Sequence, residues 1–131
     1  MIEEDYVSFE TAKLLKEKGF NEPCYTCYMV NEISHYDYCL TNFEAIEDVV
    51  TAPTLQMAMK WLREVHNIHI ELNWDKGNQL YSFQIWKSGK FQPEISSLDL
   101  WRIYKDGNYP GEWKYEEACE AAIKYCFENL I

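Results

Sequence analysis

The feature that most constrains the fold is a pair of alternating segments joined by a polar turn. In residues 68–74 (IHIELNW) every second residue is apolar and the residues between them are polar. Residues 80–87 (LYSFQIWK) alternate again after the turn-forming run 75–78 (DKGN). Side chains of a strand point to opposite faces in turn, so this pattern predicts an antiparallel hairpin that is buried on one face.

Helical patterns surround this hairpin. Residues 54–66 (TLQMAMKWLREVH) and 115–129 carry apolar residues at helical spacing, which predicts amphipathic helices. A further helix is expected over 8–18, with Ser8 as N-cap and Gly19 just after its end. These helices need a surface on which to bury their apolar faces.

The remaining segments favour strands. Residues 24–30 and 36–40 are rich in Tyr, Thr, Val and Cys, and 31–35 is expected to be the loop of a hairpin. Residues 98–105 are interpreted as a further strand, the alternative being a short helix capped by Ser97. The expected order is α-β-β-α-β-β-(β)-α. It predicts an α+β fold in which three helices pack on one antiparallel sheet, within a single domain spanning 1–131.

Charge and composition exclude several classes of function. The chain has 131 residues, with 12 basic and 22 acidic residues and a net charge of −10. This balance opposes direct binding to nucleic acids and to anionic membranes, favours solubility and leaves open a basic protein partner. The acidic N-terminus and the lack of an apolar run of membrane-spanning length predict a cytoplasmic protein. Five cysteines without an export signal are expected to be free thiols.

One set of residues has the chemistry of a zinc site, namely Cys24, Cys27, His35 and Cys39. Three thiolates and an imidazole suit tetrahedral Zn²⁺, and the first two cysteines have the spacing of a zinc knuckle. However, residues i and i+3 of a regular strand point to opposite faces, so Cys24 and Cys27 would chelate only across a bend. Small apolar residues of a hairpin are the preferred interpretation, so no metal or other cofactor is assigned.

No catalytic motif stands out. The serines lie in no nucleophile elbow, and the five glycines are scattered instead of clustered around a phosphate. His66, His69 and Glu71 could form an acid–base cluster, but solvated side chains at a helix end and on an open sheet face are the preferred explanation. A non-enzymatic protein is therefore expected.

Aromatic residues gather in the segment punctuated by Gly and Pro. Tyr and Trp anchor many protein interfaces, which makes these residues candidates for an interaction surface. The preferred interpretation is nevertheless that they pack this irregular segment onto the core. The candidates are Trp101, Tyr104, Tyr109 and Trp113.

Three stretches carry a resemblance, namely 8–20 (SFETAKLLKEKGF), 52–66 (APTLQMAMKWLREVH) and 115–126 (YEEACEAAIKYC). Together they resemble short uncharacterised proteins encoded by phages, prophages and mobile elements of anaerobic gut bacteria. The resemblance covers roughly a third of the chain and brings neither an activity nor catalytic residues. It implies an accessory protein of a mobile element.

Three functions follow from these observations. The first is a non-enzymatic accessory protein that acts by protein–protein interaction, with a partner of unknown identity or with a second copy of the chain. The second is an acidic mimic of nucleic acid that inhibits a DNA-binding host enzyme, although interspersed Lys and Arg argue against a wholly acidic face. The third is a small zinc-binding protein that uses the Cys and His set.

Overall fold

The computed structural model of the chain describes residues 2–46, 48–104 and 109–131. Its contacts divide the chain into two units, the first made of residues 1–58 and 124–131 and the second of residues 59–123. Helices α2 (Leu55–His66) and α4 (Tyr115–Asn129) supply residues to both units. Each unit combines helices with an antiparallel sheet, so the α+β class is confirmed.

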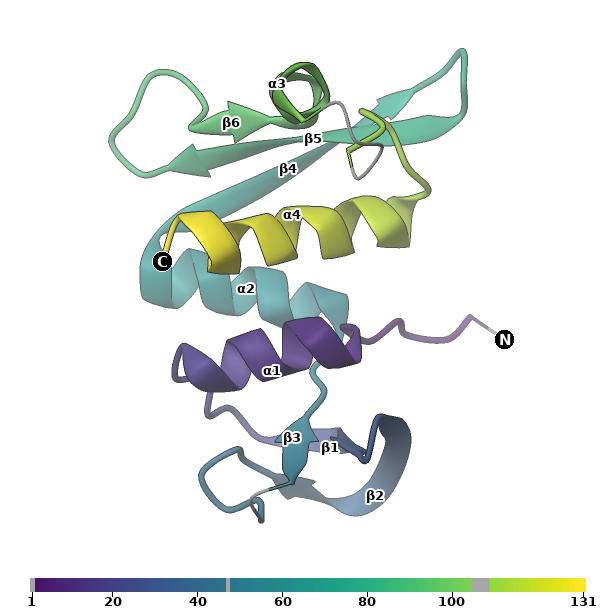
Figure 1. The fold of residues 1–131 in the computed structure, drawn as a ribbon, viewed down its shortest axis with the longest axis vertical. Helices are drawn as coiled ribbons and strands as arrows, with labels where there is room; N and C mark the ends of the chain where they lie inside the picture. Colours follow the sequence, from purple (N-terminus) through teal and green to yellow (C-terminus); the bar gives the residue numbers. More distant parts are fainter. Residues whose placement is uncertain (1, 47, 105–108) are drawn as a thin grey trace. The chain divides into compact units, whose positions relative to one another are not determined.

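The first unit contains α1 (Phe9–Glu17) and a sheet of three strands (Figure 1). Ser8 caps the helix as predicted, because its hydroxyl accepts a hydrogen bond from the Thr11 amide at 3.2 Å. Gly19 follows the helix with φ +91°, a conformation that favours glycine. The strands β1 (Cys24–Met29), β2 (Glu32–Leu40) and β3 (Val49–Thr51) lie in the order β2-β1-β3.

The hairpin of β1 and β2 differs from the prediction. Its turn contains only Val30 and Asn31, with φ angles of 52° and 67°, and β2 already begins at Glu32. Two residues of positive φ match the right-handed twist of the strands, whereas the predicted five-residue loop would not pair Met29 with Glu32. Further along, Cys24 pairs with Leu40 and Thr26 with His35, so β2 bulges opposite Tyr25.

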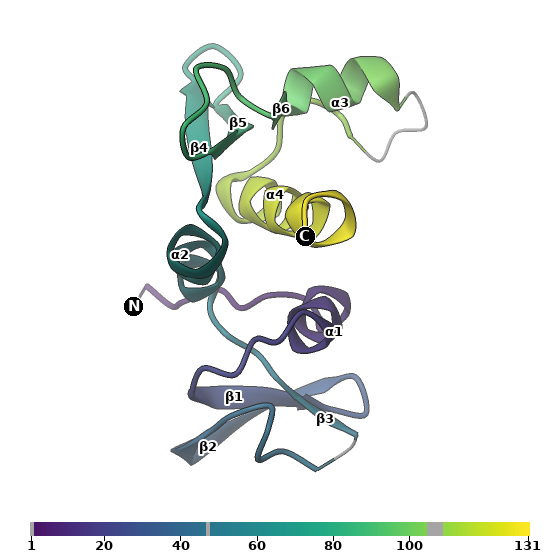
Figure 2. The ribbon, with the colours of Figure 1, turned by 90° about the vertical axis from the view of Figure 1, so that its left-hand side faces the viewer.

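The second unit contains the predicted alternating hairpin. Strands β4 (Ile68–Asp75) and β5 (Leu80–Lys87) pair over their full length, and β6 (Ile95–Ser96) adds to β5, giving the order β4-β5-β6 (Figure 2). One face of this hairpin is buried, since Ile68, Phe83 and Ile85 have almost no exposed surface. On the opposite face His69 and Glu71 are exposed, as the alternation predicts.

The strand predicted over 98–105 is wrong, because residues 98–103 belong to the helix α3 (Ser97–Ile103). Ser96 and Asp99 form a capping box at 3.1 Å in both directions, and this start signal outweighs the apolar residues that suggested a strand. The cap is thus Ser96 instead of the expected Ser97. The end of the predicted strand, Lys105, lies outside the described residues.

The single predicted sheet is also wrong, because the strands form two separate sheets of three. The strand β3, which was not expected, completes the first sheet, and β6 completes the second. Four helices are present among the described residues instead of three. A single domain over 1–131 stays a prediction.

Candidate functional site

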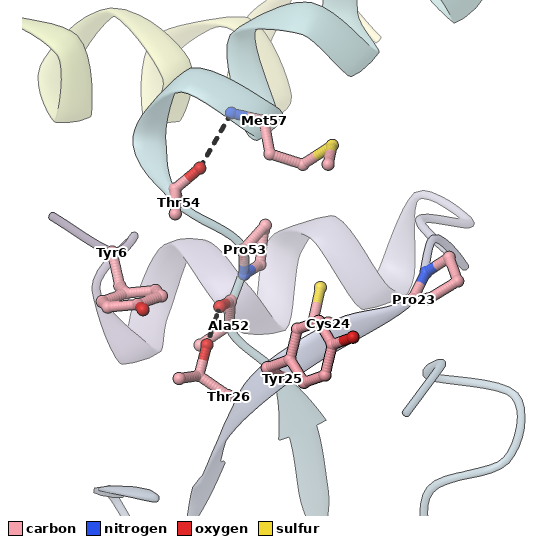
Figure 3. A pocket seen from close by; sticks show the side chains of 9 residues that line it. All are labelled: Tyr6, Pro23, Cys24, Tyr25, Thr26, Ala52, Pro53, Thr54 and Met57. Atoms are coloured by element: carbon pink, nitrogen blue, oxygen red, sulfur yellow. Dashed lines mark hydrogen bonds between the residues drawn. The ribbon is translucent and has the colours of Figure 1, made fainter. Parts of the chain in front are cut away.

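An apolar pocket opens in the first unit, where three stretches of the chain meet. Its volume is about 230 Å³. Figure 3 shows that residues preceding α1, the start of β1 and the start of α2 supply its walls. The lining residues are Tyr6, Pro23, Cys24, Tyr25, Thr26, Ala52, Pro53, Thr54 and Met57.

Backbone hydrogen bonds hold these stretches together. Tyr6 forms an antiparallel bridge with Thr54, supported by bonds from the Val7 amide to the Pro53 carbonyl and from the Leu55 amide to the Asp5 carbonyl. On the other side, the Ala52 amide donates to the Thr26 carbonyl at 2.9 Å. The pocket is therefore fixed by paired backbone instead of by side chains alone.

The two threonine hydroxyls of the lining are already engaged. The Thr26 hydroxyl donates to the Ala52 carbonyl at 2.6 Å, and the Thr54 hydroxyl accepts a bond from the Met57 amide at 3.1 Å at the start of α2 (Figure 3). The interior surface offered to a ligand is thus mainly aromatic and aliphatic. Such a surface suits an apolar group.

Cys24 contributes a thiol to the pocket. Burial raises the pKa of this thiol to about 11, so near neutral pH it is protonated. A protonated thiol is a weak nucleophile, and this one donates a hydrogen bond to the Glu22 carbonyl at 3.5 Å. Burial therefore does not activate the Cys24 thiol as a nucleophile.

Acidic residues neighbour two of the lining residues in the sequence. Asp5 precedes Tyr6 and Glu22 precedes Pro23, both are exposed, and Figure 3 places Tyr6 and Pro23 at opposite ends of the lining. The first unit has 12 acidic and four basic residues, a net charge of −8, whereas the second has ten acidic and eight basic residues, a net charge of −2. The acidic excess of the chain is thus concentrated in the unit that carries the pocket.

The four basic side chains of this unit are engaged outside the pocket. Lys13 lies over the Phe9 ring at 4.7 Å and Lys124 pairs with Glu10 at 2.8 Å. Lys16 and Lys18 donate to the backbone carbonyls of Val49 and Ile131. The lining of the pocket itself contains no Lys or Arg.

The four residues of the expected zinc set differ in their exposure to solvent. Cys24 and Cys27 are buried, while Cys39 and His35 are exposed, and the His35 ring lies against Tyr6 at 5.6 Å. Across residues 2–46, 48–104 and 109–131, no three Cys, His, Asp or Glu side chains come together as metal ligands. Coordination by this set would require the hairpin to rearrange.

The four aromatic candidates do not share one surface. Trp101 and Tyr104 are 52% and 41% exposed, and Tyr109 stacks at a tilt on Tyr104 at 5.3 Å. Trp113 instead stacks on Phe83 at 5.4 Å, and its backbone pairs with Tyr81. The packing interpretation thus describes Trp113, whereas Trp101 and Tyr104 remain open to solvent beside two residues that the sequence did not single out, Leu98 and Ile103.

Sequence reasoning missed the pocket. Its lining comes from residues 6, 23–26, 52–54 and 57, which no periodic pattern connects. The Pro residues and the threonine cap before α2 were the only local signals at this place.

Comparison with models of protein families, with curated proteins and with solved structures finds no match to this chain. Among the described residues, no helix combines the length and the apolar character that a membrane span requires.

Proposed function

We propose that the chain is a non-enzymatic accessory protein that binds a basic segment of another protein. In this proposal an apolar side chain of the partner occupies the pocket lined by Tyr6, Tyr25 and Met57, and Lys or Arg residues on either side of it lie near Asp5 and Glu22. The observation that carries the proposal is an apolar pocket of about 230 Å³ in the unit with a net charge of −8.

Two contributions to binding support this choice of partner. Burial of apolar surface supplies affinity, and an aromatic or branched side chain that fills a preformed pocket is a typical energetic anchor. Complementary charge raises the association rate and rejects acidic partners. The resemblance to mobile-element proteins supports an accessory role toward a host or phage protein.

The experiment is a fluorescence anisotropy titration with three short labelled peptides. The first alternates Lys or Arg with Leu and Trp, the second replaces the basic residues by Glu, and the third replaces the apolar residues by Ala. We expect saturable binding of the first peptide only. Its affinity should fall as ionic strength rises, because exposed charges are screened.

The matched variants are Tyr25→Ala and Tyr38→Ala. Both tyrosines are 60% exposed and lie in the same sheet, but only Tyr25 lines the pocket. Removing an aromatic anchor surface costs about 1–2 kcal/mol, so Tyr25→Ala should weaken binding roughly 5- to 30-fold and Tyr38→Ala should not. Equal affinities for all three peptides, or equal effects of the two variants, would contradict the proposal.

The exposed side of α3 is the alternative surface at which the partner could bind. If Trp101→Ala abolishes peptide binding and Tyr25→Ala does not, the aromatic residues of α3 are the contact and the pocket is not. The two outcomes are separable because Trp101 and Tyr25 belong to different units.

The concentration of acidic charge in the first unit favours one other function, mimicry of nucleic acid toward a DNA-binding host enzyme. Competition between the chain and a DNA duplex for such enzymes tests it. A mimic would displace DNA in a strongly salt-dependent manner, and Tyr25→Ala would leave this displacement unchanged, because phosphate-like charge and not apolar surface would carry the binding.

A further inference from the structure

We propose that the free edge of β4 pairs antiparallel with β4 of a second copy of the chain. In the sheet order β4-β5-β6, β4 is an edge strand, and it is paired with β5 over all eight residues Ile68–Asp75. A long edge strand presents a row of backbone donors and acceptors that another strand can use. This inference concerns the second unit alone and is independent of the peptide-binding proposal.

The hydrogen bonds at the two ends of β4 show which backbone groups point outward. The Asn67 carbonyl accepts from the Ser88 amide at 3.2 Å, and the Asp75 carbonyl accepts from the Gln79 amide at 2.7 Å. Odd-numbered residues therefore turn their backbone toward β5. In an antiparallel pair this direction alternates, so the even-numbered residues turn theirs to the outer edge. They are Ile68, Ile70, Leu72 and Trp74.

Three of these residues, Ile70, Leu72 and Trp74, leave an apolar stripe incompletely covered at this edge, whereas Ile68 is buried. Opposite them on β5, Phe83 and Ile85 are 1% and 0% exposed, but Ile70 and Leu72 are only half-buried and Trp74 is 57% exposed. Ile70, Leu72 and Trp74 of β4 are thus more exposed than Phe83 and Ile85 of β5 on the same face of the sheet. A neighbouring strand that continued the sheet would carry apolar side chains to the same face and cover this stripe.

Charge distinguishes two neighbouring registers of such a pair. With Leu72 opposite Leu72 of the second copy, Ile70 lies opposite Trp74 and Glu71 lies opposite Asn73. A shift of one residue on each strand would set Glu71 directly opposite Glu71 of the second copy, which is destabilising. The Leu72-centred register places apolar residues together on one face and avoids this repulsion.

Charge opposes this pairing only weakly. The second unit has a net charge of only −2, so two copies can approach through β4 with little repulsion between these units. In addition, the stripe is self-complementary, since an antiparallel twofold axis at Leu72 sets Ile70 against Trp74 and Leu72 against Leu72 of the second copy. The symmetric pair is the isologous interface that most homodimers use.

The first experiment is sedimentation equilibrium of the full chain and of two charge variants. Asn73→Lys would face Glu71 of the other copy at two places in each dimer, and Asn73→Glu would repel it. Each cross-strand pair changes the dissociation constant modestly, so we expect a dimer tightened roughly 2- to 30-fold by Asn73→Lys and weakened by a similar factor by Asn73→Glu.

The matched controls are Ser82→Lys and Ser82→Glu. Ser82 pairs with Asn73 inside the sheet, on β5, so these variants make the same charge changes one strand away from the edge. They should leave the dissociation constant within about twofold. A chain that stays monomeric up to about 1 mM, or a dimer that responds equally at positions 73 and 82, would overturn the inference.

A crosslink tests the register directly. In a hydrogen-bonded antiparallel pair the two Cα atoms lie about 5.5 Å apart, within the range that a disulfide spans. Leu72→Cys in a Cys39→Ser background, which removes the exposed native thiol, should therefore oxidise to a covalent dimer. Lys76→Cys, placed in the exposed turn after β4, should stay monomeric under the same conditions. Equal crosslinking at both positions would refute a pairing centred on Leu72.

Discussion

The turn between β1 and β2 offers a direct test of backbone strain. Val30 has φ 52°, although a β-branched side chain disfavours the left-handed region. An L-residue there costs about 1–2 kcal/mol, whereas Asn tolerates this conformation. We therefore expect Val30→Asn to stabilise the protein.

The magnitude follows from the exposure of Val30. Its side chain is 81% exposed, so only about a fifth of its surface leaves water on folding. Full burial of a valine contributes roughly 1.5–3 kcal/mol, which means that the substitution forfeits about 0.3–0.6 kcal/mol. Relief of the left-handed conformation is larger, and the net gain is about 1 kcal/mol. For a chain of this length that gain raises Tm by about 3–5 °C.

The assay is thermal unfolding followed by circular dichroism for the wild type, Val30→Asn and Val30→Ile. Val30→Ile is the matched control because it keeps the branched Cβ and hence the strain. We expect its Tm to equal that of the wild type. A Tm of Val30→Asn that is no higher than that of Val30→Ile would refute the strain at this turn.

Three further predictions concern a helix cap, buried thiols and an ion pair. Ser96→Ala removes the hydroxyl of the capping box of α3 and should cost about 1 kcal/mol in chemical denaturation, whereas Ser96→Asp, which can also cap, should cost much less. Burial raises the pKa of both Cys24 and Cys119 to about 11, above that of an unfolded thiol, so the stability these groups contribute is complete below about pH 8.5 and is lost as the pH rises toward 11. The double variant Cys24→Ala with Cys119→Ala should therefore lose less Tm between pH 9 and 11 than the wild type, and equal losses would contradict this origin. The hydrogen bond and charge of Lys124 lower the pKa of Glu10, so an NMR titration of the Glu10 carboxyl should show a higher midpoint in Lys124→Met, with Lys13→Met shifting it less.

The sequence determined the elements whose signals are local. Alternation in 68–74 and 80–87 predicted β4 and β5 because each strand buries one face, and helical spacing predicted α2 and α4 for the same reason. The Ser8 cap could also be predicted from the sequence, because a cap acts within one helical turn. The short helix α3 was not predicted from the sequence. Its capping box begins at Ser96, one residue before the expected cap Ser97, and its apolar residues fit a strand as well.

Only the tertiary structure decided how these elements combine. The division into two sheets depends on β3 and β6, which have three and two residues and are defined by the strands they pair with. The pocket depends on bridges between residues about 25 to 50 positions apart, such as Tyr6 with Thr54 and Ala52 with Thr26. The open edge of β4 likewise follows from which strands lie beside β5. Periodicity reports which face of a segment is buried, but it carries no information about which distant segment covers that face, and this is why the candidate sites appear only in the folded chain.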